Sequence, residues 1–147
     1  MLSIGGWGGS RYFSTAVATD ANRTAFAGAV MALVSKYDLD GLNFEYAPLA
    51  LSFGVFTYSS IHSWEYPGKQ GIGCNIVSAN DSANFLSFLQ ALHAKDGGKN
   101  ITISAAASIT PFVDSKGLPM KDVSSFAEVL DYIGTPSPTS ALSLTFV

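Results

Sequence analysis

Apolar residues follow two different spacings along this chain. Short apolar runs that are typical of β-strands occur at 2–6, 39–44, 101–107 and 132–133. Between these runs, apolar residues lie three or four positions apart, which predicts helices over about 21–37, from residue 81 or 82 to about 96, and over about 122–131. Strand and helix therefore alternate, which favours right-handed βαβ units and an α/β fold with a parallel sheet.

The predicted helices have identifiable starts and apolar faces. Asp20 is expected to cap the first helix and Asp81 or Ser82 the second, which Gly97 and Gly98 would end. The residues expected to face the core are Phe26, Val30, Leu33, Val34 and Tyr37 in the first helix, Phe85, Leu86, Leu89 and Leu92 in the second, and Phe126, Val129 and Leu130 in the third. The last segment, 134–147, is rich in Ser, Thr and Pro and fits neither spacing, so we expect a loop there.

Composition narrows the classes of partner. The chain of 147 residues is 48% apolar and 13% charged, carries a formal net charge of −3 and has no basic stripe. We therefore expect neither nucleic acid nor an anionic membrane surface as a partner. The longest apolar window, 47–56, is interrupted by proline, serine and glycine, and Met1–Gly6 lacks the basic start of a signal peptide, so neither a spanning helix nor a signal peptide is expected. The single cysteine, Cys74, excludes an intramolecular disulfide and, without a Cys/His cluster, argues against zinc.

A glycine turn with an aromatic exit follows the first predicted strand, in the phrase Ser3-Ile4-Gly5-Gly6-Trp7. Ligands of parallel α/β proteins bind at the carboxyl ends of the strands. The ring of Trp7 would offer a flat apolar face to a sugar at this edge. The alternative is a structural turn beside a packed tryptophan.

A second phrase completes a resemblance to the family 18 glycoside hydrolases, the chitinases and their relatives. Ser3-Ile4-Gly5-Gly6 resembles the family's S-x-G-G motif, and Asp40-Gly41-Leu42-Asn43-Phe44, with Trp64-Glu65-Tyr66-Pro67 further on, resembles the fungal form of its D-x-x-D-x-D-x-E motif. The resemblance covers 1–44 and 64–133. It implies a (β/α)8 barrel, of which this chain would hold strands 3 to 5 and the start of strand 6, with a segment inserted in strand 4. Residues 1–133 would then form a partial catalytic domain and 134–147 a tail outside the family.

The inserted segment separates the two halves of the second motif. The family carries one aspartate between the Phe and the Trp, whereas this chain carries 19 residues, 45–63. Glu45-Tyr46 can be encoded GAG TAY and His62-Ser63 CAY AGY, which supply a splice donor and acceptor. Joining them gives GAY, an aspartate codon, and removes 54 nucleotides, so the frame is kept. We infer that 45–63 is a retained, translated intron; a true loop insertion is the alternative.

The resemblance also assigns roles. Glu65 matches the general acid that protonates the glycosidic oxygen, and the missing aspartate would orient the substrate's N-acetyl group, whose carbonyl attacks C1. Asp40 and Asn43 match the first two acidic positions of the motif, although asparagine departs from the commonest residue at the second. The residues expected to contact substrate are Gly5, Gly6, Trp7 and Tyr66. The implied partner is chitin or a chito-oligosaccharide, and no metal or cofactor is implied.

In the chain as written, Glu65 lies 22 positions after Asn43 (65 − 43). Strand alternation would place Glu45 in the orienting position and Ala47 where the acid belongs. Catalytic groups must be held within a fraction of an ångström of their productive positions, so we expect this chain to be inactive. Hydrolysis of β-1,4-linked N-acetylglucosamine polymers would belong to the parent enzyme, which the resemblance implies is extracellular. A non-catalytic carbohydrate-binding protein and a mis-spliced fragment without function are the alternatives.

Three triplets match the acceptor for N-glycosylation: Asn22-Arg23-Thr24, Asn80-Asp81-Ser82 and Asn100-Ile101-Thr102. They suit a secreted parent protein, although such short triplets also arise by chance.

Overall fold

Four parallel strands and one antiparallel strand form a single sheet in the computed structural model, which describes residues 1–5, 9–45, 75–106, 112–134 and 143–145. The strands are β1 (Leu2–Gly5), β2 (Gly41–Glu45), β3 (Thr102–Ala106), β4 (Tyr132–Gly134) and β5 (Ser143–Thr145). They are hydrogen-bonded in chain order, and β1 to β4 are parallel. The predicted parallel α/β sheet is therefore confirmed.

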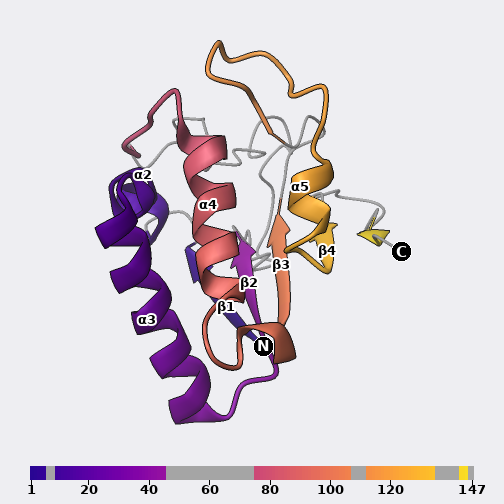
Figure 1. The fold of residues 1–147 in the computed structure, drawn as a ribbon. Coiled ribbons are helices and arrows are strands. Elements are labelled where there is room, and N and C mark those ends of the chain that lie inside the picture. The colour runs from indigo at the N-terminus through magenta and orange to yellow at the C-terminus, as the bar shows by residue number, and fades with distance from the viewer. Residues whose placement is uncertain (6–8, 46–74, 107–111, 135–142, 146–147) are drawn as a thin grey trace, which may run out of the picture.

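Helices connect the parallel strands. They are α2 (Phe13–Val17), α3 (Asp20–Tyr37), α4 (Asp81–His93) and α5 (Ser124–Ala127), with short 3-10 turns η1 (Ser10–Tyr12) and η2 (Gly98–Asn100). Figure 1 shows the arrows of β2 and β3 pointing the same way, with α3 and α4 on the same side of the sheet. Strands in sequential order with their helices on one face are the arrangement of a (β/α)8 barrel, so the described structure is consistent with part of such a barrel.

The first long helix buries part of the predicted face. Val30 and Val34 are buried as predicted and Phe26 packs against the core, whereas Leu33 and Tyr37 are 39% and 60% exposed, and Ala27 and Met31 are buried in addition. The docking angle of the helix, and not hydrophobicity alone, selects its buried stripe.

The predicted N-cap of this helix was wrong by one position. The N-cap is Thr19, whose hydroxyl accepts the Asn22 N–H at 3.2 Å, and Asp20 is the first helical residue.

The second long helix buries Phe85, Phe88, Leu89 and Leu92, where the sequence prediction had Leu86 in place of Phe88. The segment before it is a turn closed by two hydrogen bonds: the Asp81 carboxylate accepts the Ser78 N–H at 2.8 Å, and the Asp81 N–H donates to the Ser78 carbonyl. The helix ends at His93, before the predicted stop at Gly97. Gly97, with φ of 78°, lies in the turn that precedes η2.

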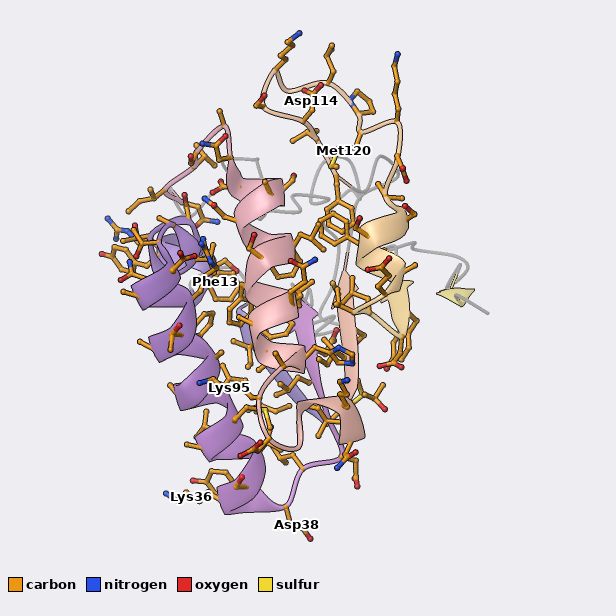
Figure 2. The ribbon with its side chains drawn as sticks, in the orientation of Figure 1. Phe13, Lys36, Asp38, Lys95, Asp114 and Met120 are labelled. Atoms are coloured by element: carbon orange, nitrogen blue, oxygen red, sulfur yellow. The ribbon has the colours of Figure 1, made fainter. Side chains whose placement is uncertain are left out.

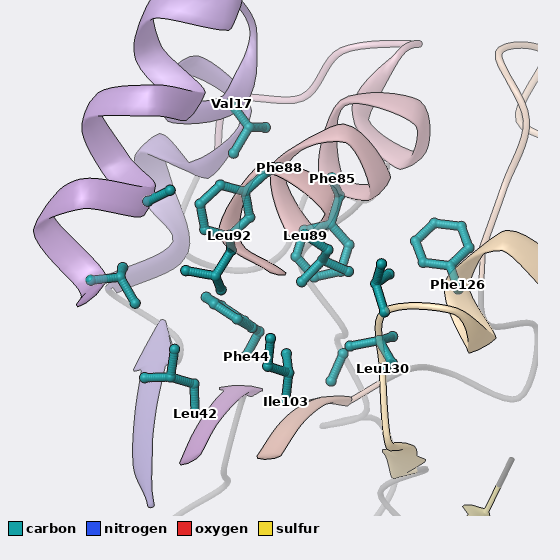
Figure 3. Packing of buried hydrophobic residues seen from close by; sticks show 14 of the residues in the cluster. Val17, Leu42, Phe44, Phe85, Phe88, Leu89, Leu92, Ile103, Phe126 and Leu130 are labelled. Carbon is teal, nitrogen blue, oxygen red and sulfur yellow. The ribbon is translucent and has the colours of Figure 1, made fainter. Parts of the chain in front are cut away.

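Phe88 lies at the centre of the core that joins the helices to the sheet. Its ring stacks on Phe26 of α3 at 4.7 Å between centroids and meets Phe44 of β2 edge-on at 5.5 Å. Figure 3 shows Phe88, Phe85, Leu89 and Leu92 of α4 between the helix backbone and the sheet residues Leu42, Phe44 and Ile103. The apolar face of the sheet is therefore the one that the helices cover.

The third helix, α5, has only the four residues Ser124–Ala127 instead of the predicted ten. The Asp122 carboxylate accepts the Ser124 N–H at 2.9 Å just before it, and this hydrogen bond lowers the pKa of Asp122. After the helix, Asp131 donates its N–H to the Ile103 carbonyl and accepts the Ile103 N–H at 2.7 Å. These two hydrogen bonds attach the chain after α5 to β3, so the helix ends early and the chain continues into the sheet.

The expectation that 134–147 forms no regular element was wrong. Ser143–Thr145 forms β5, which pairs antiparallel with β4 in the register Ile133↔Leu144. Three-residue strands carry little periodicity of their own, so the sequence pattern could not identify this one.

The sheet is curved, with its polar face on the inside. Neighbouring strands lie about 4.8 Å apart, so β1 and β4 would be about 14 Å apart in a flat sheet. The Tyr132 hydroxyl on β4 nevertheless donates to the sulfur of Met1, next to β1, at 3.3 Å. Together with the barrel-like order of the strands and helices, this contact favours a curved sheet with the polar face on its concave side.

Candidate functional site at the carboxyl ends of the strands

The carboxyl ends of β1, β2 and β3 lie side by side on one edge of the sheet. Ser3 is in register with Asn43, which is in register with Ser104, and Gly5 is in register with Glu45. In parallel α/β folds this edge is where ligands bind. The sheet therefore brings together Gly5 of the first motif and Asn43 of the second.

Gly5 makes the turn that the sequence predicted at the end of β1. Its φ of +113° is a conformation that only glycine adopts at low cost. A Cβ on this residue would also lie 2.9 Å from the Ser10 hydroxyl oxygen and 3.2 Å from the Phe13 ring. Glycine is required here on both counts, because the chain turns sharply against η1 and α2.

Gly41 has a separate packing role at the start of β2. A Cβ there would lie 2.5 Å from the Thr102 carbonyl oxygen on β3. Asp40, immediately before it, is exposed, and its carbonyl accepts the Thr102 N–H at 3.0 Å. Asp40 thus lies at the amino end of β2, about 10 Å along the strand from Asn43. The structure does not bring the Asp40 carboxylate to the carboxyl edge.

Asn43 faces the concave side of the sheet, because its neighbours Leu42 and Phe44 are buried under the helices. The Ser104 hydroxyl donates a hydrogen bond to Asn43 Oδ1 at 2.8 Å. Ser104 is only 1% exposed. An amide held in this way can donate through Nδ2 but cannot take up or release a proton.

The sequence analysis missed Ser104. The signal was present in the alternation of Thr102 and Ser104 with Ile101, Ile103 and Ala105, which places the two hydroxyl residues on the face opposite the core. The alternation does not determine the register between the two strands, which places Ser104 beside Asn43.

Four of the predicted site residues lie outside the described residues: Gly6, Trp7, Glu65 and Tyr66. Strand β2 continues to Glu45, one residue beyond the predicted strand, so its backbone includes the first residue of the inserted segment. The described part of the site consists of Gly5, Asn43, Ser104 and the strand ends that carry them.

A cavity of about 250 Å³ lies beyond the same edge, between the start of α4 and the loop that follows β3. Its lining residues are Val77, Ser78, Ala79, Asp81, Ser82, Val113, Asp114, Ser115 and Gly117. Figure 2 shows the loop that carries Asp114 and Met120 rising past the start of α4. The Asp114 carboxylate accepts the N–H groups of Lys116 and Leu118, and the Asp81 carboxylate accepts the Ser78 N–H. Both carboxylates therefore have structural partners.

Within the described ranges, no three side chains of the metal-ligating types gather at one point. In the same ranges, no helix has the length and apolar character needed to cross a bilayer.

The family model "Glycosyl hydrolases family 18" matches residues 1–134. The chain is 45% identical over 132 residues to a chitinase-like effector of Moniliophthora roreri and 39% identical over 132 residues to a chitinase-like effector of Moniliophthora perniciosa. These alignments cover 90% of this chain but only 27% and 26% of the two relatives. Among solved structures, a chitinase from Rhizomucor miehei matches 90% of this chain and 37% of its own, with a TM-score of 0.71 and 32% identity.

Proposed function

Because the chain belongs to glycosyl hydrolase family 18, we propose that its parent domain hydrolyses β-1,4-linked N-acetylglucosamine polymers and that the 147-residue chain does not. The observation that carries the proposal is the position of β2. The second motif runs along this strand from Gly41 to the carboxyl edge of the sheet, where Asn43 lies beside β1 and its glycine turn. The chain spans about a quarter of the length of the relatives it matches, so the activity belongs to a larger protein.

The proposed reaction needs the acid close to Asn43. In the uninterrupted motif the acid follows Asn43 by four positions, so both side chains share one face of the strand. The acid, Glu65 here, would protonate the glycosidic oxygen while the substrate's own N-acetyl carbonyl attacks C1. The aspartate between them would hold the N-acetyl group, with Trp7 and Tyr66 against the sugar.

The inserted segment is the reason to expect an inactive chain. Glu65 lies 20 positions beyond Glu45, the last residue of β2 (65 − 45). Strand geometry therefore no longer fixes its distance from Asn43. A displacement of about 1 Å can cost about 100-fold in rate, and an intervening segment of this length does not by itself position Glu65 to within 1 Å.

The test begins with the transcript and ends with two matched enzymes. Reading the messenger across 45–63 shows whether the segment is removed and replaced by one aspartate codon. The full-length product of that messenger is then assayed on a fluorogenic chito-oligosaccharide, with and without 45–63, and with Glu65→Gln as the control. We expect release of fluorophore only from the product that lacks the segment and keeps Glu65. Comparable hydrolysis by the segment-bearing product would refute the proposal.

A second candidate function is non-catalytic binding of chitin. It is favoured by the two relatives described as chitinase-like effectors, which are 45% and 39% identical to this chain. A chitin pull-down separates the two functions: retention on chitin without product from the segment-free protein supports binding, whereas turnover supports hydrolysis.

A further inference from the structure

The three acceptor triplets for N-glycosylation lie in different backbone conformations. A glycan is compatible with the folded chain only at an asparagine on the surface, where a bulky hydrophilic group can extend into water. A triplet that is modified in its folded conformation also has to present its hydroxyl residue, two positions on, beside the asparagine. Both conditions can be read from the fold.

Asn100-Ile101-Thr102 meets both conditions. Asn100 is exposed at the end of η2, Ile101 is extended with φ of −112° and ψ of 144°, and Thr102 begins β3. In an extended segment, side chains two positions apart lie on the same face. The Asn100 amide and the Thr102 hydroxyl are therefore on one side of the folded chain.

Asn22-Arg23-Thr24 fails the second condition. Asn22 is exposed, but it lies in the first turn of α3, where residues two positions apart are about 200° apart around the axis. Its Nδ2 also donates to the Thr15 carbonyl at 2.8 Å, at the corner between α2 and α3. A glycan on Nδ2 would have to displace or crowd this contact.

Asn80-Asp81-Ser82 fails for a related reason. Asn80 is exposed, but Ser82 lies inside α4 and is only 5% exposed. The two hydrogen bonds between Ser78 and Asp81 hold the segment in its turn. The hydroxyl of this triplet is therefore withdrawn from the surface that carries the asparagine.

We propose that Asn100 is the N-glycosylation site of this chain in a secretory compartment, and that Asn22 and Asn80 are not modified. In the reaction, Asn100 Nδ2 forms a bond to C1 of an oligosaccharide carried on a polyprenyl diphosphate. The bond between C1 and the phosphate oxygen breaks, the polyprenyl diphosphate leaves, and the amide loses one proton. Asn100 precedes β3, so the glycan would lie at the amino edge of the sheet, at the foot of β3 in Figure 1, and would leave the carboxyl edge open.

The experiment uses the full 147-residue chain, secreted from yeast behind a cleavable leader and ending in an added acceptor triplet. Occupancy is scored by mass spectrometry of glycopeptides, only in molecules whose added triplet is glycosylated, because these have reached the transferase. We expect occupancy at Asn100 to exceed that at Asn22 and Asn80 by at least about tenfold.

Matched variants separate recognition from incidental effects. Asn100→Gln and Thr102→Ala should each remove the glycan, Thr102→Ser should retain it, and Asn22→Gln and Asn80→Gln should leave it unchanged. Occupancy that is equal at the three triplets, greater at Asn22 or Asn80, or absent at Asn100 would overturn the proposal.

Discussion

At the carboxyl edge of the sheet, the Ser104 hydroxyl on β3 donates a hydrogen bond to the side-chain oxygen of Asn43 on the adjacent strand β2. The two residues are 61 positions apart in the chain and 2.8 Å apart in the fold. Because Ser104 is buried, water cannot replace the hydroxyl if it is removed. The pair therefore links the local geometry of the site to the stability of the sheet.

Ser104→Ala should lower the free energy of unfolding by about 0.5–1.5 kcal/mol, because it removes the donor of the part-buried hydrogen bond to Asn43 Oδ1. Ser87→Ala is the matched control: Ser87 is also a serine that donates to an oxygen, the Ala83 carbonyl at 3.0 Å, but on an exposed helix surface. Its effect should stay within about 0.5 kcal/mol. Urea denaturation of both variants measures the difference, and equal effects would show that the Asn43 contact contributes nothing.

At the scale of elements, the sequence located both long helices but predicted their buried faces only in part. Apolar periodicity includes Leu33 and Tyr37, whereas the docked α3 exposes them and buries Ala27 and Met31 instead. The reason is that a helix with apolar residues on more than one side can dock in several rotations, and the neighbouring helix and the sheet decide between them.

Phe88 gives the sharpest test of the observed faces. Phe88→Ala should cost about 3–5 kcal/mol, because the ring is 1% exposed and contacts both Phe26 and Phe44. Leu33→Ala, on the predicted face of α3, should cost less than about 1 kcal/mol, because Leu33 is 39% exposed. Thermal or chemical unfolding of the two variants distinguishes the structure from the sequence prediction, which places Leu33 in the core and leaves Phe88 out of it.

At the scale of the whole molecule, the sheet is a curved strip with two different edges. A partial barrel with strands 3 to 5 and the start of strand 6 would have an unpaired parallel strand at each edge of its sheet. In the described residues β1 ends the strand order on one side, but β4 is paired on the other side by β5. An antiparallel strand from the segment outside the family match thus covers an edge that would otherwise be open to another chain.

Removal of 135–147 should therefore promote self-association. Without β5, the backbone N–H and C=O groups of β4 become available to a second molecule. Light scattering coupled to size-exclusion chromatography should show a larger oligomeric fraction for this truncation than for removal of 146–147 alone, which leaves β5 intact. An unchanged monomer fraction would mean that β5 does not protect the sheet.

The sequence by itself determined the alternation of strand and helix, the glycine turn at Gly5 and the strand that carries Asn43. These depend on local spacing and on backbone preferences, which neighbouring residues set. Only the tertiary structure decided the exposure of Leu33 and Tyr37 in α3, the burial of Phe88 in α4, the Ser104 partner of Asn43, the position of Asp40 at the amino edge and the pairing of β5. Each of these depends on register or docking between segments far apart in the chain, and local periodicity contains no information about which segment lies opposite.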